Sequence, residues 1–142
     1  MKKIWAVLAL WFALSASVLA QGESADEAGV RDAVMAYFLA GNQGDPDLAR
    51  RAFETDTGVM FIHREDETGS TVEGMNLGDF AARFTRTNPD RTITFHDITV
   101  AEGAVASAHI TIVWGDREVD DMFLLYKLDG EWKIVAKAFT WH

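Results

Sequence analysis

The chain has 142 residues, of which 49% are hydrophobic and 25% charged, and its formal net charge at pH 7 is −9. This acidic balance argues against nucleic acid and anionic membrane surfaces as partners, because both need a positively charged protein face. The chain contains no cysteine, which excludes disulfides and a lipid-bearing cysteine. It also lacks the short motifs of serine hydrolases, zinc proteases and nucleotide-binding enzymes, so those classes have no support.

The first twenty residues predict a cleavable secretory signal. Lys2 and Lys3 form a positive start, residues 4–14 are apolar, and residues 18–20 carry the short side chains that precede a cleavage position. The apolar stretch is too short for a stable membrane span. We therefore expect a mature chain covering residues 21–142, folded as a single domain in the periplasm or outside the cell, with no membrane attachment.

Three helices are predicted in the first half of the mature chain. Ser24 is a predicted helix cap, and apolar residues then recur at helical spacing until segment 41–44, whose glycines and asparagine should end the helix. Asp45 followed by Pro46 is typical of the start of a second, shorter helix. Residues 76–86 predict a third helix, which an asparagine–proline pair should end.

The remaining segments have the character of strands. Residues 59–64 predict a first strand, and residues 71–73 are expected to pair back on it. Four long strands then follow one another with short turns, at residues 92–101, 105–114, 118–128 and 131–141. Helices followed by a strand meander predict an α+β fold, with three helices packed on one face of an antiparallel sheet.

The turn at Asp129-Gly130 sets the register of this sheet. Such a pair between alternating apolar runs indicates a type I′ hairpin, and it places Lys127 opposite Trp132. Because side chains alternate across a strand, the residues sort onto two faces. The face expected to meet the helices, called the inner face, carries Ile93, Phe95, Ala108, Ile110, Ile112, Trp114, Phe123, Leu125, Trp132, Ile134 and Ala136. The opposite, outer face carries His96, His109, Thr111, Met122, Leu124, Tyr126, Val135, Lys137 and Phe139.

Asp121 is the exception on the inner face. Its predicted neighbours are Ile112, Phe123 and Ala138, and a carboxylate in such surroundings must be paired, reach the mouth of a pocket, or hold its proton. Asp121 is therefore a functional-site candidate, and a structural aspartate satisfied by hydrogen bonds is the alternative.

Two features mark the outer face. His96 and His109 are expected to be neighbours, which could support a metal or a pH-sensitive contact, but no third ligand is evident and no metal site is predicted. A row of large apolar side chains predicts an interface, and we expect a homodimer formed through Met122, Leu124, Tyr126, Val135 and Phe139.

The chain resembles the NTF2-like superfamily, which includes nuclear transport factor 2, ketosteroid isomerase, scytalone dehydratase and the SnoaL-like cyclases. The resemblance rests on segment 37–45 (YFLAGNQGD) followed by Phe53, and segments 121–127 (DMFLLYK), 129–135 (DGEWKIV) and 137–139 (KAF) are similar to its "putative lumazine-binding" branch. It implies a curved sheet wrapped around a long helix, a cone with an apolar pocket, and a frequent homodimer through the outer face. Tyr37 falls where ketosteroid isomerase has its oxyanion-binding tyrosine. Phe61 takes the place of the catalytic aspartate, so that mechanism cannot operate unchanged.

We therefore expect a protein that binds a small apolar or aromatic molecule without a cofactor and without turning it over. One alternative is a proton-transfer enzyme (isomerase, dehydratase or cyclase) with Asp121 or His63 as acid or base and Tyr37 as hydrogen-bond donor. Another is an interaction module that acts through the outer face. The residues expected to contact the ligand are Tyr37, Phe61, His63, Phe80, Phe84, Phe95, Ile110, Trp114, Asp121, Phe123 and Trp132.

Overall fold

The computed structural model describes residues 22–142, and the predicted secretory signal lies outside them. The elements in chain order are α1 (Ala25–Gln43), α2 (Pro46–Ala52), β1 (Val59–Asp66), β2 (Gly69–Asn76), α3 (Leu77–Ala81), β3 (Thr92–Ala101), β4 (Val105–Trp114), β5 (Arg117–Leu128) and β6 (Glu131–Trp141). The α+β prediction is confirmed, and four of the predicted strands match within a residue.

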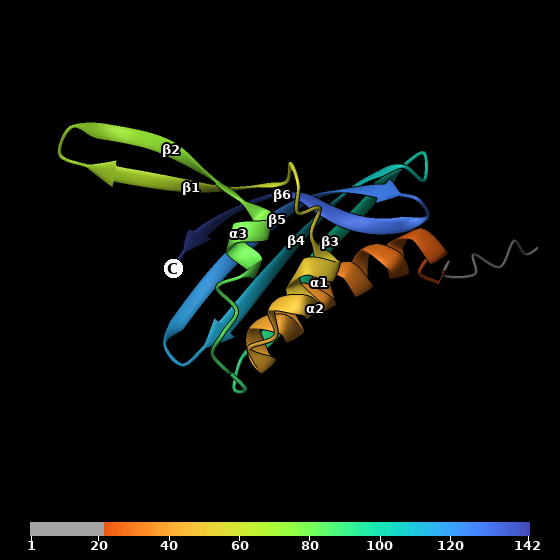
Figure 1. The fold of residues 1–142 in the computed structure, drawn as a ribbon, viewed down its shortest axis with the longest axis horizontal. Helices are drawn as coiled ribbons and strands as arrows, with labels where there is room; N and C mark the ends of the chain where they lie inside the picture. Colours follow the sequence, from red (N-terminus) through yellow and green to blue (C-terminus); the bar gives the residue numbers. More distant parts are fainter. Residues whose placement is uncertain (1–21) are drawn as a thin grey trace, which may run out of the picture.

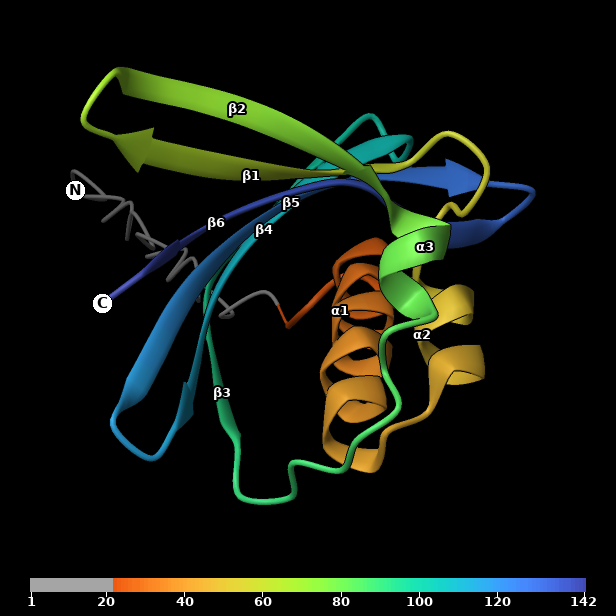
Figure 2. The same cartoon turned by 60° about the vertical axis from the view of Figure 1, so that its left-hand side comes forward.

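The six strands form one curved sheet in the order β2-β1-β6-β5-β4-β3, and all three helices lie on its concave side (Figures 1 and 2). The long helix α1 lies along the hollow of the sheet, while the β1–β2 hairpin projects beyond the other strands (Figure 2). The sheet is mixed rather than purely antiparallel, because β1 runs parallel to β6 over three residue pairs. This pair links β1, the first described strand in the sequence, to β6, the last described strand.

The helix starts follow local sequence signals. Ser24 and Glu27 form a capping box at α1, in which each side chain bonds the other's backbone N–H. The Asp45 side chain accepts from the N–H groups of Asp47 and Leu48 at the start of α2. Gly44 ends α1 at φ +66°, a left-handed conformation that glycine adopts without steric cost.

The third helix is shorter than predicted. It covers only Leu77–Ala81, and residues 82–91 form a loop that returns along α1. The Asn88 backbone N–H donates to Asn42 O at 2.9 Å, which ties the loop to the end of α1. Tertiary contacts override the helical spacing here, and Phe84 packs edge-on against Phe80 at 5.0 Å instead of extending the helix.

The hairpins confirm part of the predicted register. Asp129 and Gly130 have φ values of +50° and +84°, as a type I′ turn requires, and Lys127 pairs with Trp132. The β4–β5 turn is shorter than predicted. Asp121 therefore pairs with Ile110 and not, as predicted, with Ile112. This shift of two residues keeps Asp121 on the inner face.

Two β-bulges alter the predicted faces. The β3–β4 pairing shifts between Phe95 and Asp97, so His96 is an extra residue rather than the direct partner of His109. The β5–β6 pairing shifts between Leu124 and Leu125, which brings Phe123 opposite Lys137.

The second bulge reverses the faces of β6 beyond Val135. Lys137 is only 3% exposed and Phe139 is half-buried, and both point into the concave side of the sheet. Their predicted place on the outer face is therefore wrong. One extra residue in a strand exchanges the two faces downstream, and the hydrophobic pattern alone did not locate that residue.

The core lies between α1 and the inner face. Val30 and Val34 of α1, and Ile110, Leu125 and Ile134 of the sheet, have no exposed surface. Within residues 22–142, no helix is both long enough and apolar enough to cross a membrane.

Candidate functional site

A cavity of about 700 Å³ opens beside α1, between the inner face of the sheet and the loop that follows α3. Its size lies within the range typical of small-molecule sites. Six aromatic side chains line it: Tyr37, Phe80, Phe84, Trp114, Phe139 and Trp141. Several of these rings pack edge-on, as in the pair Trp114–Trp141, whose ring centres lie 5.4 Å apart at 72°. The aromatic walls offer flat apolar surfaces to a ligand.

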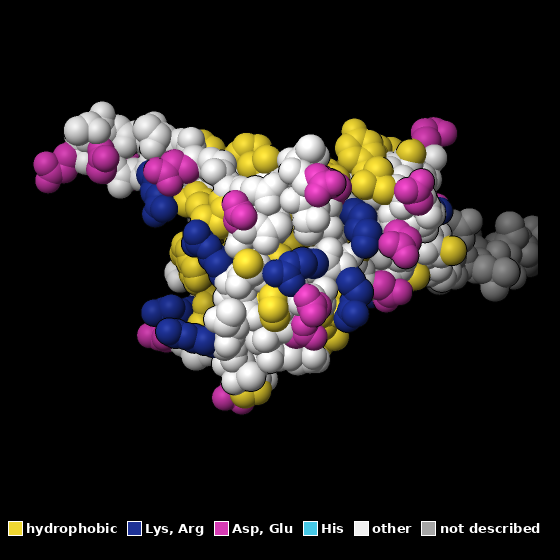
Figure 3. All heavy atoms as spheres, in the orientation of Figure 1, with side chains coloured by type: hydrophobic (Ala, Val, Ile, Leu, Met, Phe, Trp, Pro, Cys, Tyr) yellow, Lys and Arg dark blue, Asp and Glu magenta, His cyan; other side chains and the backbone are white. Residues whose placement is uncertain are grey.

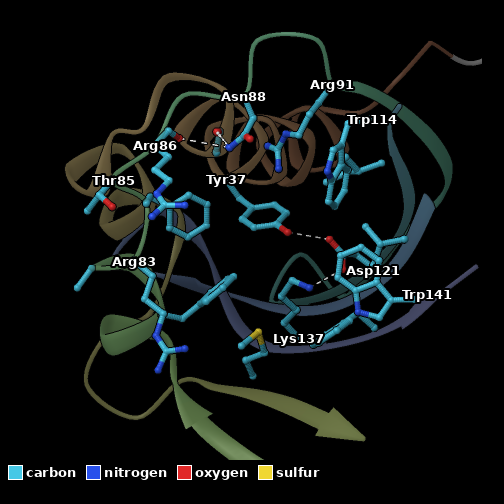
Figure 4. Close-up of a pocket in the computed structure, with 18 residues that line it drawn as sticks. Tyr37, Arg83, Thr85, Arg86, Asn88, Arg91, Trp114, Asp121, Lys137 and Trp141 are labelled. Atoms are coloured by element: carbon cyan, nitrogen blue, oxygen red, sulfur yellow. Dashed lines mark hydrogen bonds and ion pairs between the residues drawn. The ribbon is translucent and has the colours of Figure 1, made fainter. Parts of the chain in front are cut away.

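A buried polar cluster forms the floor of the cavity. The Tyr37 hydroxyl donates to Asp121 Oδ2 at 2.9 Å, and the Lys137 ammonium donates to Asp121 Oδ1. Asp121 has no exposed surface, and Tyr37 and Lys137 are also buried. Figure 4 shows the three side chains pointing toward one another. The prediction that Asp121 lies on the inner face is thus confirmed, and its charge partner is Lys137.

Burial changes the acid–base properties of this cluster. Burial raises the pKa of Tyr37 well above its ordinary value, and the nearby Asp121 charge and hydrogen bond add to the effect. Burial also lowers the pKa of Lys137, while the Asp121 carboxylate acts in the opposite direction. The hydroxyl is therefore kept protonated, and the carboxylate is held between two donors.

Cationic side chains surround the rest of the cavity. Arg83, Arg86 and Arg91 line it together with Lys137, and Asp121 is the single acidic residue in the lining. In Figure 4, Arg83 and Arg86 lie across the cavity from Asp121. The space-filling view shows Lys and Arg side chains beside exposed hydrophobic groups below the β1–β2 hairpin (Figure 3). This concentration of positive charge stands out in a chain whose net charge is −9.

Arg91 is held rigidly in the cavity wall. Its guanidinium donates to Phe38 O and to Asn42 Oδ1, both at 2.7 Å, and it lies 5.8 Å from the centre of the Trp114 ring. Burial lowers the pKa of Arg91, although the guanidinium remains charged at neutral pH. A Cβ on Gly41 would come within 2.3 Å of this guanidinium, so a glycine in α1 allows the close approach.

Five of the predicted ligand-contacting residues line this cavity: Tyr37, Phe80, Phe84, Trp114 and Asp121. The other six lie elsewhere. Ile110 and Phe123 are buried in the core, and the Phe123 ring packs edge-on against the Tyr37 ring, with 5.5 Å between their centres. Trp132 donates to Asp26 at the far end of α1, and Phe95 lies under the Arg31 guanidinium.

Phe61 and His63 are exposed on β1, and Met60 is the residue of that strand that lines the cavity. Their predicted place in the pocket is wrong, because β1 presents its even-numbered side chains to the concave side. The catalytic alternative that used His63 therefore loses its geometric basis. Arg91 and Lys137 were missed, since an arginine in a loop and a lysine beyond a bulge give no pattern that marks them as cavity residues.

Comparison with known proteins supports the family resemblance. The model of a family described as "Putative lumazine-binding" matches residues 25–140. No curated protein matches the chain at a significant level.

Several solved structures share the fold. An NTF2-like protein of unknown function from Methylobacillus flagellatus is 27% identical, with a TM-score of 0.68, and the alignment covers 84% of this chain and 94% of that one. One of the same description from Shewanella baltica is 23% identical, with a TM-score of 0.66 and coverage of 81% and 92%. A ketosteroid isomerase-like protein from Erwinia carotovora is 18% identical, with a TM-score of 0.59 and coverage of 80% and 94%. The fold, the cavity and the match over residues 25–140 lead to one conclusion: this chain belongs to the "Putative lumazine-binding" family of the NTF2-like superfamily.

Proposed function

We propose that the protein binds a small aromatic molecule carrying an acidic group, and that it does so in the cavity beside α1. The observation that carries this proposal is the combination of aromatic walls with four cationic side chains around one space of about 700 Å³. The aromatic part of this ligand agrees with the ligand class expected from the sequence. The acidic group is included because the cationic side chains of the cavity would attract it.

The two arginines of the loop after α3 support the acidic group most directly. Within residues 22–142, the side chains of Arg83 and Arg86 form no ion pair. Lys137 is already neutralised by Asp121, and Arg91 is held by neutral oxygens. Guanidinium groups recognise planar carboxylates through paired hydrogen bonds, so Arg83 and Arg86 are suited to an anionic substituent at the mouth.

A calorimetric titration with two related probes tests the proposal. Lumazine supplies a flat bicyclic ring, and its 6-carboxylate supplies the same ring with an anionic group. We expect both to bind and the carboxylate to bind more tightly. Arg86→Gln should weaken the carboxylate by roughly tenfold, the cost of one charge-assisted contact, and should leave lumazine nearly unchanged.

Arg51→Gln is the matched control, because Arg51 is exposed on α2 and does not line the cavity. Equal affinity of the two probes, or equal effects of the Arg86 and Arg51 variants, would contradict the acidic-group assignment. If no flat aromatic probe binds to the wild type or to Trp114→Ala, the binding function as a whole is contradicted.

A proton-transfer enzyme is the second candidate, favoured by the convergence of Tyr37, Asp121 and Lys137 at the cavity floor. A substrate carbonyl beside Tyr37 could accept its hydrogen bond, and Asp121 could then act as base. The test is deuterium exchange at the α-carbon of 2-tetralone, followed by NMR. Acceleration that Tyr37→Phe abolishes would establish this reading, and a rate equal to that in buffer would exclude it for this ketone.

Two further proposals concern the state of the protein. The order of charged, apolar and short residues in segment 1–20 supports export with removal of this segment.

Met122, Leu124 and Tyr126 are each half-exposed along the outer face, and this row supports a homodimer through that face. Phe139 is not part of it, because it lines the cavity.

A further inference from the structure

Three of the four histidines of the chain meet around one carboxylate on the outer face of the sheet. His142 Nε2 lies 2.7 Å from Asp120 Oδ2, and His109 Nε2 lies 3.6 Å from Asp120 Oδ1. The His96 ring stacks on the His109 ring, with 4.6 Å between their centres. The cluster therefore brings three imidazoles and a carboxylate from β3, β4, β5 and the end of the chain into one place.

The spacing of the ligand atoms is close to that of a metal site. One donor atom from each of His96, His109 and Asp120 lies within 4.8 Å of the others. A tetrahedral zinc ion with bonds of about 2.0–2.1 Å needs donor atoms about 3.4 Å apart. The His109–Asp120 distance of 3.6 Å already fits, and side-chain rotation can bring the His96 ring the remaining distance.

Local features of the fold hold these side chains. The bulge in β3 turns His96 toward its neighbour, and bulges commonly re-aim a side chain at a site. The His142 backbone N–H donates to Glu118 O at 2.9 Å, which fixes that residue beside β5. The Thr111 hydroxyl donates to Asp120 Oδ1, as the supporting groups of metal ligands do.

We propose that His96, His109 and Asp120 bind a divalent first-row transition ion such as Zn²⁺, while His142 supports the site by holding the second carboxylate oxygen of Asp120. Imidazole and carboxylate together suit Zn²⁺, whereas Ca²⁺ and Mg²⁺ take oxygen ligands. His96 exchanges its present 2.6 Å hydrogen bond with Thr111 for the metal. The site lies on the opposite side of the sheet from the cavity, so it is separate from the ligand site.

Zinc titration of the protein without a histidine tag tests this assignment. We expect one saturable Zn²⁺ site per chain by calorimetry, and a cobalt complex with the intense visible absorption of tetrahedral coordination. His96→Ala, His109→Ala and Asp120→Asn should each weaken zinc binding by more than about tenfold, because each removes a direct ligand. Thermal melts without metal show whether each variant is folded before its affinity is compared.

His63→Ala is the matched control, because His63 is the remaining histidine and is exposed on the β1–β2 hairpin. Full zinc affinity in this variant, with loss in the other three, supports the site. The proposal is overturned if the wild type shows no saturable binding, which would leave a hydrogen-bonded network only. It is also overturned if all four variants, folded in the melts, weaken zinc binding equally.

Discussion

Tyr37 of α1 and Asp121 of β5 are 84 positions apart in the chain, and their side chains form a 2.9 Å hydrogen bond beneath the cavity. The same carboxylate pairs with Lys137 of β6. The helix and two neighbouring strands are therefore linked through a single buried aspartate. Any change at Asp121 acts at once on the stability of the fold and on the floor of the candidate ligand site.

Asp121→Asn should destabilise the protein. The substitution keeps the shape of the side chain but leaves the Lys137 ammonium buried without its counterion, and breaking such a pair costs about 3 kcal/mol of unfolding free energy. Urea denaturation measures the loss. Asp116→Asn, in the exposed β4–β5 turn, is the control and should change the free energy by less than about 0.5 kcal/mol. Equal stability of the two variants would show that Asp121 is not paired in solution.

The double variant Asp121→Asn with Lys137→Met should be more stable than the sum of the single effects predicts. Each single change leaves one buried charge unpaired, whereas the double change removes both charges. The coupling free energy from this double-mutant cycle should be at least about 1 kcal/mol and should favour the double variant. Additive effects would mean that the two side chains do not interact.

Stability should decrease above about pH 10 because of Tyr37. Its pKa is raised in the folded state, so the hydroxyl contributes stability that is complete below the unfolded pKa of about 10 and is lost as pH rises toward the folded pKa. Lys137 has the opposite effect on stability. Its pKa is lowered in the folded state, so the free-energy cost of burying it falls as pH rises toward its unfolded pKa of about 10.5.

Melting curves from pH 8 to 11 on wild type and Tyr37→Phe separate the two contributions. The tyrosine-dependent decrease should be absent from the variant, and a Lys137→Met background should remove the opposing increase. The chain has two tyrosines, and Tyr126 is exposed. Tyrosinate absorbance should therefore develop in two steps, with the later one coinciding with unfolding. A single early step for both tyrosines would contradict the burial of Tyr37.

Leu124→Lys should convert the proposed homodimer into a monomer. Leu124 is 52% exposed at the centre of the apolar row on the outer face, and a lysine there would place two charges against each other across a two-fold interface. Sedimentation velocity at micromolar concentration gives the mass. Val72→Lys is the control, because Val72 is exposed on the projecting hairpin. A wild-type monomer would refute the dimer, and a dimer lost only in the Val72 variant would move the interface to β2.

Export should leave a protein that begins near Gln21. Intact-mass measurement on material recovered from the periplasm or the medium should lack the mass of residues 1–20. Material that is found only in the cytoplasm, or that retains Met1, would contradict the proposal.

Much of the fold could be predicted because its signals are local. The Ser24 cap, the Asp45-Pro46 helix start and the Asp129-Gly130 turn each depend on a few adjacent residues, and each is present in the structure. Alternation from these points placed Asp121 correctly on the inner face. It failed on β6 beyond Val135, where one additional residue moved Lys137 and Phe139 to the cavity.

The composition of the site was harder to predict. Aromatic residues such as Phe84 are recognisable from spacing, but the approach of Arg91 to α1 depends on long-range packing and on the absence of a side chain at Gly41. The meeting of His96 and His109 with Asp120 likewise follows from a bulge and a turn length, and neither was specified by the hydrophobic pattern.

The position of β6 has a consequence for synthesis. This last strand lies in the interior of the sheet, between β5 and β1, and it supplies the only partner that joins the β1–β2 hairpin to the other described strands. β6 follows all the other described strands in the sequence, so the hairpin and the meander cannot join before β6 has left the ribosome. The sheet of the nascent polypeptide therefore stays incomplete until β6 has emerged, and only then can the hairpin and the meander close around α1.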